Sequence, residues 1–540
     1  MNKKFILLII FILGLIGSYR LFRPGYFSMQ DDMHIFRLQQ FDQCIHDLQI
    51  PCRYIAEGGF GYGYPLFNFY SPLPYVVGEI FHLIGFSFID SIKIVFIITS
   101  FIRPIGIYLL SSFFFGSGGG LISAIIFSLA PYQAVNSYVR GAIAENLALA
   151  LIPFIFYFSI KKRYLLFSLS LFFLALSHNL TFLYTVPFLF LTHLLFYRSS
   201  ILKFLKYSLL GFLMSAFFLI PAYFEKQFTT VQTMTQGYFY YIIHFITLKQ
   251  LFFNHNDWGY GASLWGPIDD MSFQLGYLQW LIPLGIITYI FLRLKSKIKN
   301  RYLIIFLFVA GLFFLFLTHN KSTFIWQSIP LLPFYQFPWR FLAPAIFTLS
   351  LLSGFLSQFK FFKNYRYLII LSILVVEIIL NFSFFKEDIW FSKLTDQQKL
   401  SPANITAQSG AGLKDYWPSF STTFPDKFSS DPEIISGNAQ INSFSKNSNS
   451  ASGEITVTSE NALINLPVVY FPNFSLKIDN QTSPYLIDRD LGLITLKLPP
   501  GLHTFSLRFE DTPIRFIANI VTIVSSIIFI LLTIFREKKS

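Results

Sequence analysis

The chain has 540 residues, of which 54% are hydrophobic and only 13% are charged, and its mean hydropathy is +0.55. A soluble domain cannot bury that much apolar surface, so the composition excludes a soluble globular protein and predicts a polytopic α-helical membrane protein. The formal net charge of +13 does not indicate a nucleic-acid partner. Most lysines and arginines fall in short runs between apolar segments, where they set the orientation of membrane helices.

Apolar runs close to the length of a bilayer crossing recur along the chain. The first of them follows Lys3 and Lys4 and resembles a signal peptide. No small-residue cleavage site follows it, which predicts a retained helix. Twelve spans are predicted, near 5–22, 90–113, 120–132, 142–160, 164–177, 180–197, 204–222, 273–292, 302–318, 341–357, 367–385 and 514–535.

The basic residues predict the topology, because cytoplasmic loops are enriched in lysine and arginine. Beyond the N-terminal lysines, basic runs lie at 161–163, 198–206, 293–301, 360–366 and 536–539. Twelve spans place all of them on one side, with both termini in the cytoplasm. The run 75–86 carries Glu79 and His82 and is short for a crossing. A further crossing there would invert every later basic run, so we expect an interfacial helix on the outer surface of the cell membrane.

The segment 386–512 is the one long stretch that has the composition of a soluble domain. Alternating apolar and polar residues predict strands at 454–460, 463–471, 474–479, 492–498 and 501–510. We expect a small extracytoplasmic β-sandwich that buries one face of each strand, including Ile455, Val457, Ile494 and Leu496. The Asn- and Ser-rich stretch 438–453 predicts a loop. The domains expected are a membrane domain at 1–385, the β domain at 386–512, and a final helix with a basic cytoplasmic tail at 513–540.

The first outer loop, 23–89, carries the most concentrated polar chemistry. Asp31, Asp32, His34 and Arg37 follow directly on the first span. A helix predicted from Asp32 to about Leu48 places Asp31 and His34 on one face. Two carboxylates at a membrane surface can bind a divalent cation or act as a general base. The alternative is a capped helix start, since Asp is favoured in the first turn.

A glycine-rich loop follows in the same outer segment. Four glycines between Gly58 and Gly63 alternate with Tyr62 and Tyr64, so the backbone can approach a ligand closely. The loop is not a phosphate-binding P-loop, because no Gly-Lys-Ser/Thr follows it. The alternative is a turn that leads into the interfacial helix.

Three further positions carry polar residues at the outer ends of predicted spans. Arg140 and Glu145 flank Gly141-Ala142 at the outer end of one span and could form either a functional or a structural ion pair. His178 ends another span, where a hydrogen-bonded interfacial histidine is the alternative to a ligand-binding one. Arg340 opens a third span and could bind a lipid phosphate with its planar fork, or extend its charged end to the surface.

Two charged residues, Arg103 and Glu377, fall inside predicted spans. Buried charges in a membrane are costly unless they are paired, so we expect these two to pair inside the helix bundle. The chain has two cysteines, Cys44 and Cys52, both in the first outer loop. They could form a disulfide in an oxidising compartment, which two cysteines alone do not establish. No Cys or His cluster has the spacing of a zinc site.

These motifs together resemble a known family. The stretches are Asp31-x-x-His34-x-x-Arg37, GYGYPLFNFYSPLPY, PYQAVNSYVRGAIAENLA, SHN at 177–179, FQLG at 273–276 and QFPWRF at 336–341. They resemble a bacterial and archaeal family of membrane proteins labelled "6-pyruvoyl-tetrahydropterin synthase-related". The resemblance covers roughly residues 1–385 and extends more weakly to the final span. Tetrahydropterin synthase chemistry needs a zinc–histidine site in a soluble fold, and this sequence offers neither.

The architecture is also similar to the C-type glycosyltransferase superfamily, whose members transfer a sugar from a polyprenyl-phosphate donor. The resemblance implies that Asp31 or Asp32 corresponds to the acidic residue of their first outer loop, and that 75–86 is a juxtamembrane helix. It implies an outer-face glycosyltransferase whose partners are membrane lipid, the polyprenyl-phosphate-sugar donor and a glycan, lipid or protein acceptor. A divalent cation, Mg or Mn, would be the cofactor, with Asp31 and Asp32 as its ligands.

The alternative function is a non-enzymatic transporter or assembly factor for lipid-linked glycans. For the enzyme, we expect catalytic roles for Asp31, Asp32 and His34. Contacts with the substrate or donor phosphate are expected for Arg37, Tyr62, Tyr64, Arg140, Glu145, His178 and Arg340.

Overall fold

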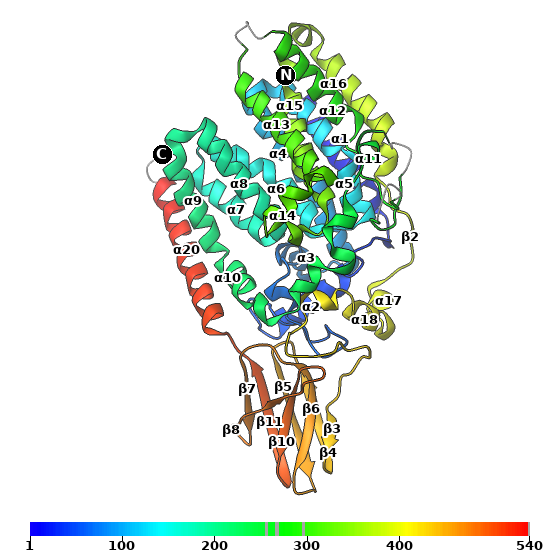
Figure 1. The fold of residues 1–540 in the computed structure, drawn as a ribbon, viewed down its shortest axis with the longest axis vertical. Coiled ribbons are helices and arrows are strands. Elements are labelled where there is room, and N and C mark those ends of the chain that lie inside the picture. Colours follow the sequence, from blue (N-terminus) through cyan, green and yellow to red (C-terminus); the bar gives the residue numbers. More distant parts are fainter. Residues whose placement is uncertain (254–257, 265–268, 294–297, 538–540) are drawn as a thin grey trace. The chain divides into compact units, whose positions relative to one another are not determined.

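The computed structural model describes residues 1–253, 258–264, 269–293 and 298–537 (Figure 1). The predicted basic runs at 293–301 and 536–539 lie partly outside these residues. The chain forms two compact units, each built from three separate segments. The first unit contains residues 1–32, 90–212 and 235–394, and the second contains residues 33–89, 213–234 and 395–540.

The first unit is almost entirely helical. Its helices are α1 (Lys3–Ser18), most of α4 (Phe88–Ser128), α5 (Pro131–Ala134), α6 (Ile143–Ile160), α7 (Tyr164–Ser177), α8 (Asn179–Phe196), most of α9 (Ile201–Met214), α11 (Leu248–Phe252), α12 (Tyr277–Leu292), α13 (Arg301–Leu317), α14 (Thr323–Ser328), α15 (Leu342–Ser353) and α16 (Lys360–Asn381). A short antiparallel pair of strands, β1 (Tyr26–Phe27) and β2 (Trp390–Phe391), links the first and the last of the three segments that make up this unit.

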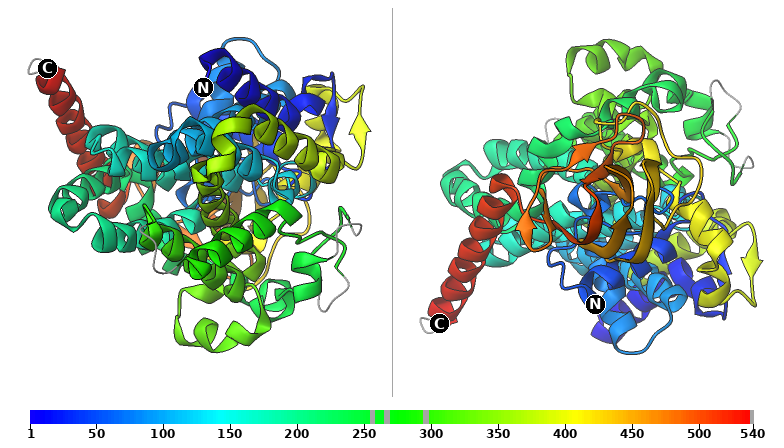
Figure 2. Two further views of the ribbon diagram at one scale, coloured as in Figure 1. Left: turned by 90° about the horizontal axis from the view of Figure 1, so that it is seen from above. Right: turned by 90° about the horizontal axis from the view of Figure 1, so that it is seen from below.

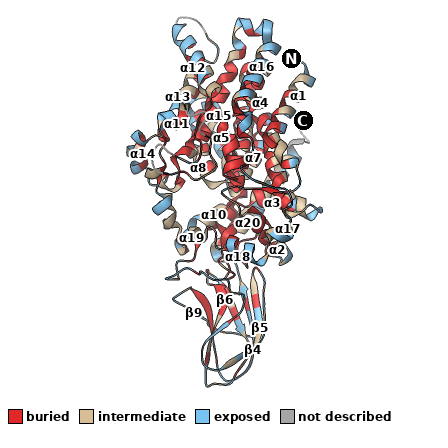
Figure 3. Cartoon of the chain, turned by 90° about the vertical axis from the view of Figure 1, so that its right-hand side faces the viewer, coloured by how far each residue is buried: buried red, intermediate tan, exposed pale blue. Residues whose placement is uncertain are grey.

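Several of these helices identify a multi-pass membrane protein. Within the described residues, seven helical segments are long and apolar enough to cross a membrane, or nine if each of two bent pairs is one span. The bends, of 75° and 94°, follow Met214 and Leu317. Figure 3 draws α15 almost entirely as buried, and every one of its residues is buried. A helix that is apolar all round and buried all round belongs to the centre of a bundle.

Helix α4 is a helical hairpin rather than one long rod. Its backbone leaves the helical region at Gly116, where φ is +75° and ψ is 176°, a conformation that favours glycine. The hydroxyls of Ser111 and Ser123 lie 2.8 Å apart across this turn. Twelve residues of straight helix would separate them by about 18 Å, so the two arms fold back on each other. The predicted segments 90–113 and 120–132 therefore lie on different arms.

Small residues allow the hairpin to pack tightly against the end of α15. A Cβ at Gly354 would lie 2.7 Å from Ser123 Oγ and 2.9 Å from the carbonyl oxygen of Gly119, and would also meet Ser111 Oγ. The side chain of Ser357 donates to the carbonyl oxygen of Phe115 at 2.9 Å. Close backbone approach at glycine and serine is the usual packing device of membrane helices, where no hydrophobic effect draws the helices together.

The second unit combines short helices, one long helix and two antiparallel sheets. Its helices are α2 (His34–His46), α3 (Leu73–Leu83), α10 (Ala216–Glu225), α17 (Asp396–Lys399), α18 (Pro402–Ser409), α19 (Leu413–Tyr416) and α20 (Pro513–Glu537). Helix α3 has 11 residues, about 16 Å of helix, which is too short to cross a bilayer. Helix α20 is one uninterrupted helix in both views of Figure 2.

The strands of the second unit form two sheets, and Figure 1 labels their strands except β9, which is labelled in Figure 3. Their bounds are β3 (Glu433–Ser436), β4 (Ala439–Lys446), β5 (Ser450–Val457), β6 (Ala462–Val469), β7 (Phe474–Ile478), β8 (Gln481–Thr482), β9 (Leu486–Ile487), β10 (Leu493–Leu498) and β11 (Gly501–Phe509). One sheet has the order β3-β6-β10-β9 and the other β4-β5-β11-β7-β8. The predicted burial of Ile455, Val457, Ile494 and Leu496 is confirmed, because each is at most 3% exposed.

The loop predicted at 438–453 was wrong. Those residues form most of the β4–β5 hairpin, in which Ala439 lies opposite Val457 and Lys446 opposite Ala451. Strand β4 is polar because it is the edge of its sheet and most of it is at least partly exposed. A polar edge strand discourages pairing with other chains, and its composition resembles that of a loop.

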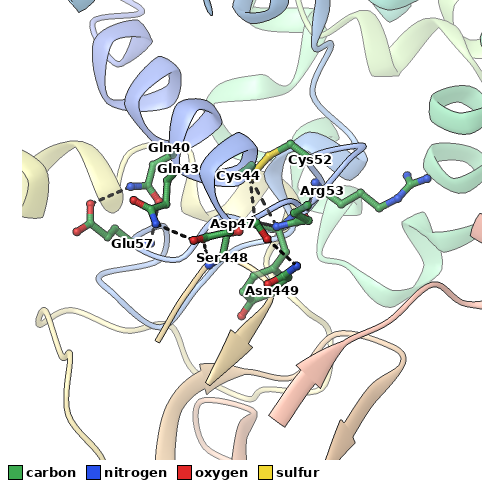
Figure 4. Close-up of a disulfide and its surroundings, with 11 residues drawn as sticks. Gln40, Gln43, Cys44, Asp47, Cys52, Arg53, Glu57, Ser448 and Asn449 are labelled. Atoms are coloured by element: carbon green, nitrogen blue, oxygen red, sulfur yellow. Dashed lines mark hydrogen bonds between the residues drawn. A yellow bond between two sulfur atoms is a disulfide. The ribbon is translucent and has the colours of Figure 1, made fainter. Parts of the chain in front are cut away.

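A disulfide joins Cys44, near the end of α2, to Cys52 and closes the loop between them, which lies beside this hairpin (Figure 4). Within the closed loop, Asp47 Oδ2 accepts the backbone N–H of Ser448 at 2.6 Å. Gln43 donates to the other oxygen of Asp47 at 3.0 Å. The segment 44–52 and the β4–β5 turn are therefore tied by charge-assisted hydrogen bonds on a covalently closed loop.

A buried ion pair ties α10 to α20 inside the second unit. Glu225 is 1% exposed and Arg515 is 0% exposed, and Arg515 Nε donates to Glu225 Oε2 at 2.9 Å. Asn68 donates to the same oxygen at 2.8 Å, and the hydroxyl of Thr512 donates to Oε1 at 2.7 Å. With its oxygens accepting three hydrogen bonds, the carboxylate is compensated for its loss of water.

Candidate functional site

The segment between α5 and α6 builds the centre of the candidate site. Val135–Val139 form a π-helix, a rare widened turn that is frequent at functional sites. Gly141 follows with φ +65°, and a Cβ there would lie 2.8 Å from Met29 Cβ. This close approach lets the backbone N–H of Asp31 donate to the carbonyl oxygen of Arg140 at 2.9 Å. The segment that follows β1 is thereby fixed with Asp31 next to Arg140.

Arg140 and Glu145 form a buried ion pair. Arg140 Nη1 donates to Glu145 Oε2 at 2.8 Å and to Asn136 Oδ1 at 2.5 Å. The hydroxyl of Tyr132 donates to Glu145 Oε1 at 2.6 Å. The guanidinium of Arg140 also lies over the ring of Trp339, 4.7 Å from its centre. Burial is the largest single influence and opposes the charge of Arg140, but Glu145, Tyr132 and Asp31 together outweigh it and hold the pKa of Arg140 above its ordinary value.

Arg340 lies beside this pair but is not hydrogen-bonded to Glu145. Its Nε lies 3.8 Å from Glu145 Oε2, beyond hydrogen-bonding distance. Its Nη1 donates to the carbonyl oxygen of Tyr335 at 2.9 Å and to Gln336 Oε1 at 3.1 Å. Among the described residues, Nε has no hydrogen-bond partner. A buried N–H donor of this kind is suited to an anion.

His178 completes the group. It precedes α8, and its Nδ1 accepts the backbone N–H of Thr181 at 3.3 Å. Burial lowers the pKa of His178 to about 3, with Glu145 opposing and Arg340 and Arg140 assisting that shift. The imidazole is therefore neutral at physiological pH. The carboxylate of Asp31 lies within electrostatic reach of Arg140 and Arg340.

The structure thus brings together five of the residues singled out from the sequence. We refer to Asp31, Arg140, Glu145, His178 and Arg340 as the arginine cluster. All five belong to the first unit. Their formal charges, with His178 neutral, cancel to zero. A singly charged phosphodiester would meet the N–H donors of Arg340 without requiring the Arg140–Glu145 pair to break.

The predicted helix start at Asp32 is corrected by the structure. Helix α2 begins at His34, and its N-cap position is Met33, which makes no side-chain capping bond. Asp31 and Asp32 lie in the turn that precedes the helix. Neither aspartate therefore occupies the N-cap position of α2.

The remaining predicted site residues lie in the second unit and have interior contacts there. His34 is 0% exposed, and its Nδ1 is 3.0 Å from the hydroxyl of Tyr75. Arg37 lies over the ring of Tyr70, 4.2 Å from its centre. The Tyr64 hydroxyl donates to the carbonyl oxygen of Gly412 and accepts the Tyr416 N–H, both at 2.9 Å.

Tyr62 also contributes to the interior of the second unit. Its carbonyl oxygen accepts two hydrogen bonds, one from the N–H of Val469 at 2.7 Å and one from the hydroxyl of Tyr54 at 3.2 Å. The glycine-rich loop thereby contacts strand β6. Gly59 and Gly63 adopt positive φ where a Cβ would meet Trp417 and Tyr54 respectively. These glycines are required for close packing of the loop.

A divalent cation has limited support from side chains. Within the described ranges, no group of three or more His, Cys, Asp or Glu side chains is placed to hold a metal ion. Magnesium is commonly bound by one or two carboxylates, with water and substrate phosphates supplying the other oxygens. Asp31 and Asp32 would hold Mg or Mn only together with such additional ligands.

The predicted pairing of Arg103 with Glu377 was wrong. Arg103 donates to the side chain of Asn146, which in turn donates to Ser137 Oγ at 2.9 Å. Glu377 accepts N–H groups from Gln279 at 3.1 Å and Asn381 at 2.5 Å. Each charge contacts neutral amide groups, which replace water without an opposite charge, while Arg103 Nε has no hydrogen-bond partner among the described residues.

Three contributors to the site escaped the sequence argument: Tyr132, Asn136 and Trp339. All three lie within motifs already recognised, PYQAVNSYVRGAIAE and QFPWRF. Aromatic residues beside a span are typical of a membrane interface, which hides their role. The sequence signal that could have found these three residues was their short separation along the chain from Arg140, Glu145 and Arg340.

Comparisons with known proteins add no functional assignment. No protein-family model matches the chain. A protein of Lactococcus lactis subsp. cremoris (strain MG1363), itself uncharacterized, is 24% identical over 313 residues. The matched region covers 54% of this chain and 49% of that relative, so the chain spans about half the length of the relative that it matches.

Proposed function

We propose that this protein is an integral-membrane glycosyltransferase, which moves a sugar from a polyprenyl-phosphate donor to an acceptor on the outer face of the membrane. The observation that carries the proposal is the arginine cluster. Arg340 retains a buried N–H without a hydrogen-bond partner among the described residues, and the carboxylate of Asp31 lies within reach of its charge. An anion-binding group beside a carboxylate is the minimum that this chemistry needs.

The reaction proceeds by displacement at the anomeric carbon. The Asp31 or Asp32 carboxylate takes the proton of an acceptor hydroxyl, and the acceptor oxygen forms a bond to C1 of the sugar. The bond between C1 and the phosphate oxygen breaks, and polyprenyl phosphate leaves with one additional negative charge. Arg340 stabilises that developing charge through its N–H groups, while Arg140 holds Glu145 and keeps the site ordered.

The architecture proposed with this function has twelve spans, both termini in the cytoplasm, a C-type glycosyltransferase membrane domain and an outer β-sandwich. The two arms of α4 and the bent helix pairs supply segments for additional crossings. The disulfide between Cys44 and Cys52 supports an outer location of the first loop, because disulfides persist in oxidising compartments.

A transporter of lipid-linked glycans is the second candidate. Two helix pairs are bent by 75° and 94° at short breaks, and broken helices are a feature of transporters. A transporter would bind the lipid phosphate but would not cleave the sugar from it.

Sugar transfer by the purified protein in nanodiscs tests the proposal. Polyprenyl-phosphate sugars carrying a radiolabel serve as donors, and Asp31→Asn, Asp32→Asn and Arg340→Gln are compared with wild type. Loss of a general base lowers the rate by about 10²–10⁴-fold, and we expect this for at least one aspartate. Arg340→Gln weakens polyprenyl-phosphate binding by about 10-fold or more.

Arg163→Gln is the matched control, because Arg163 is exposed and lies outside the cluster. Thermal stability of each variant separates a lost function from a lost fold. Normal transfer by both aspartate variants would remove the carboxylates from the mechanism. Phosphate binding that depends on Arg340, with sugar never released from any donor, would favour the transporter.

A further inference from the structure

The hydrogen bonds of His178 determine which ring nitrogen carries its proton. Nδ1 accepts the backbone N–H of Thr181 at 3.3 Å and lies 2.8 Å from the hydroxyl of the same residue. A nitrogen that accepts an N–H bond has a free lone pair, so in the neutral ring the proton is on Nε2. Within the part of the chain that the structure describes, Nε2 has no hydrogen-bond partner.

The surroundings keep this ring uncharged. Thr181 lies in the first turn of α8, where the unsatisfied backbone N–H groups create a positive potential. Arg340 and Arg140 add positive charge, and among the residues that the structure describes Glu145 is the carboxylate that acts on the ring in the opposite sense. A second positive charge on His178 would be repelled by the helix terminus and by both guanidinium groups.

We propose that His178 is a neutral hydrogen-bond donor, which presents Nε2–H to an oxygen of the substrate bound at the arginine cluster and takes no part in proton transfer. The proposal rests on the proposed function, since it assumes that a phosphate or sugar oxygen occupies the cluster. The proposal gives each residue a separate role. An aspartate takes the proton of the acceptor hydroxyl, Arg340 stabilises the charge that develops on the phosphate, and His178 orients the substrate.

The protein contains a natural control for this role. His319 begins the same His-Asn sequence as His178, and its Nδ1 likewise accepts a backbone N–H, that of Lys321, at 3.2 Å. Lys321 is the charged group that acts on His319, whereas three members of the cluster act on His178. Substitution of His319 therefore tests the capping role by itself.

The first experiment is ¹⁵N NMR of the histidine-labelled protein in detergent, with the His178→Asn spectrum used to assign the His178 signals. We expect one protonated and one unprotonated ring nitrogen, unchanged between about pH 5 and about pH 8. A ring that gains a second proton near its ordinary pKa of about 6.5 would overturn the proposal.

The second experiment measures binding of polyprenyl phosphate in nanodiscs. Ser and Asn are both good N-cap residues, so His178→Ser keeps the cap without a donor of the same reach, and His178→Asn keeps the cap with an amide donor. We expect about a 10-fold loss of affinity for His178→Ser, since a hydrogen bond to a charged group is removed. His178→Asn should stay within about 3-fold of wild type, and His319→Ser should be unchanged.

The outcomes separate this inference from the proposed function. Unchanged affinity in His178→Ser, together with a loss in Arg340→Gln, would refute the role of His178 and leave the phosphate site intact. Unchanged affinity in both variants would refute the phosphate site itself. A loss in His178→Asn equal to that in His178→Ser would show that an amide donor cannot replace the imidazole, and would overturn the simple donor role.

Discussion

Gly354→Ala tests the packing of the α4 hairpin against the end of α15. The new methyl group would lie 2.7 Å from Ser123 Oγ and 2.9 Å from the carbonyl oxygen of Gly119, and would meet Ser111 Oγ as well. Such overpacking costs about 1–3 kcal/mol. Separation of the two serine hydroxyls removes a hydrogen bond worth about 1 kcal/mol. The substitution should therefore lower the free energy of unfolding by about 2–4 kcal/mol.

Gly285→Ala is the matched control, because Gly285 lies within α12 and a Cβ there would have no neighbour within 4 Å. Replacement of a helical glycine by alanine in open space should stabilise the protein by about 1 kcal/mol. Unfolding by SDS titration in mixed micelles measures both variants. The combination of Gly354→Ala with Ser123→Ala should recover part of the loss, since one crowded oxygen is gone. Equal stability of Gly354→Ala and Gly285→Ala would refute the close packing at the hairpin.

Three further predictions concern the second unit. Glu225→Gln leaves the buried Arg515 without its carboxylate and should cost about 3–5 kcal/mol of unfolding free energy in the same SDS titration. Burial and the neighbouring Asp42 raise the pKa of Glu79 from 4.5 to about 7, so the folded state holds a proton that the unfolded state releases, and stability should fall as the pH rises from about 4.5 through 7. Glu79→Gln cannot ionise and should gain on wild type by up to about 3 kcal/mol between about pH 5 and pH 8, measured as unfolding free energy at each pH. Asp47→Ala removes the acceptor for the β4–β5 turn and should speed hydrogen exchange there by about 10-fold.

Controls for these variants come from exposed positions of the same unit. Glu433 lies on β3, where every residue is exposed, and Glu433→Gln should change stability by less than about 0.5 kcal/mol at any pH. A stability of Glu79→Gln that follows wild type at all pH values would rule out the raised pKa. Unaltered exchange in Asp47→Ala would mean that the carboxylate of Asp47 does not hold the turn.

The sequence predicts the helices of this protein well because apolar runs are unambiguous in so hydrophobic a chain. Four members of the arginine cluster, Arg140, Glu145, His178 and Arg340, were singled out one by one, since they are conspicuous polar residues at the ends of those runs. Which of them meet could not be foreseen. That depends on the π-helix before Arg140 and on the positive φ of Gly141, neither of which leaves a pattern in the residues around it.

The wrong pairing of Arg103 with Glu377 has a physical origin. Arg103 and Glu377 were expected to pair because charges are conspicuous in a sequence and amides are not. Asn146 is the partner of the first, and Gln279 is one partner of the second. A buried charge can be satisfied by any well-placed dipole, and only the three-dimensional arrangement identifies which dipole is present.

The second unit imposes an order on the synthesis of the protein. Arg53 donates to Asn519, which lies 466 residues later in the chain. At a typical elongation rate of about 5–20 residues per second, the ribosome needs roughly 20–90 s to make that stretch. Throughout this interval the guanidinium of Arg53 lacks Asn519, and Asn68, 15 residues further along the chain, is the partner already made. Insertion of the last helix is therefore the event that closes the first loop, and a chain halted before it would expose a loop that is complete in sequence and unassembled in structure.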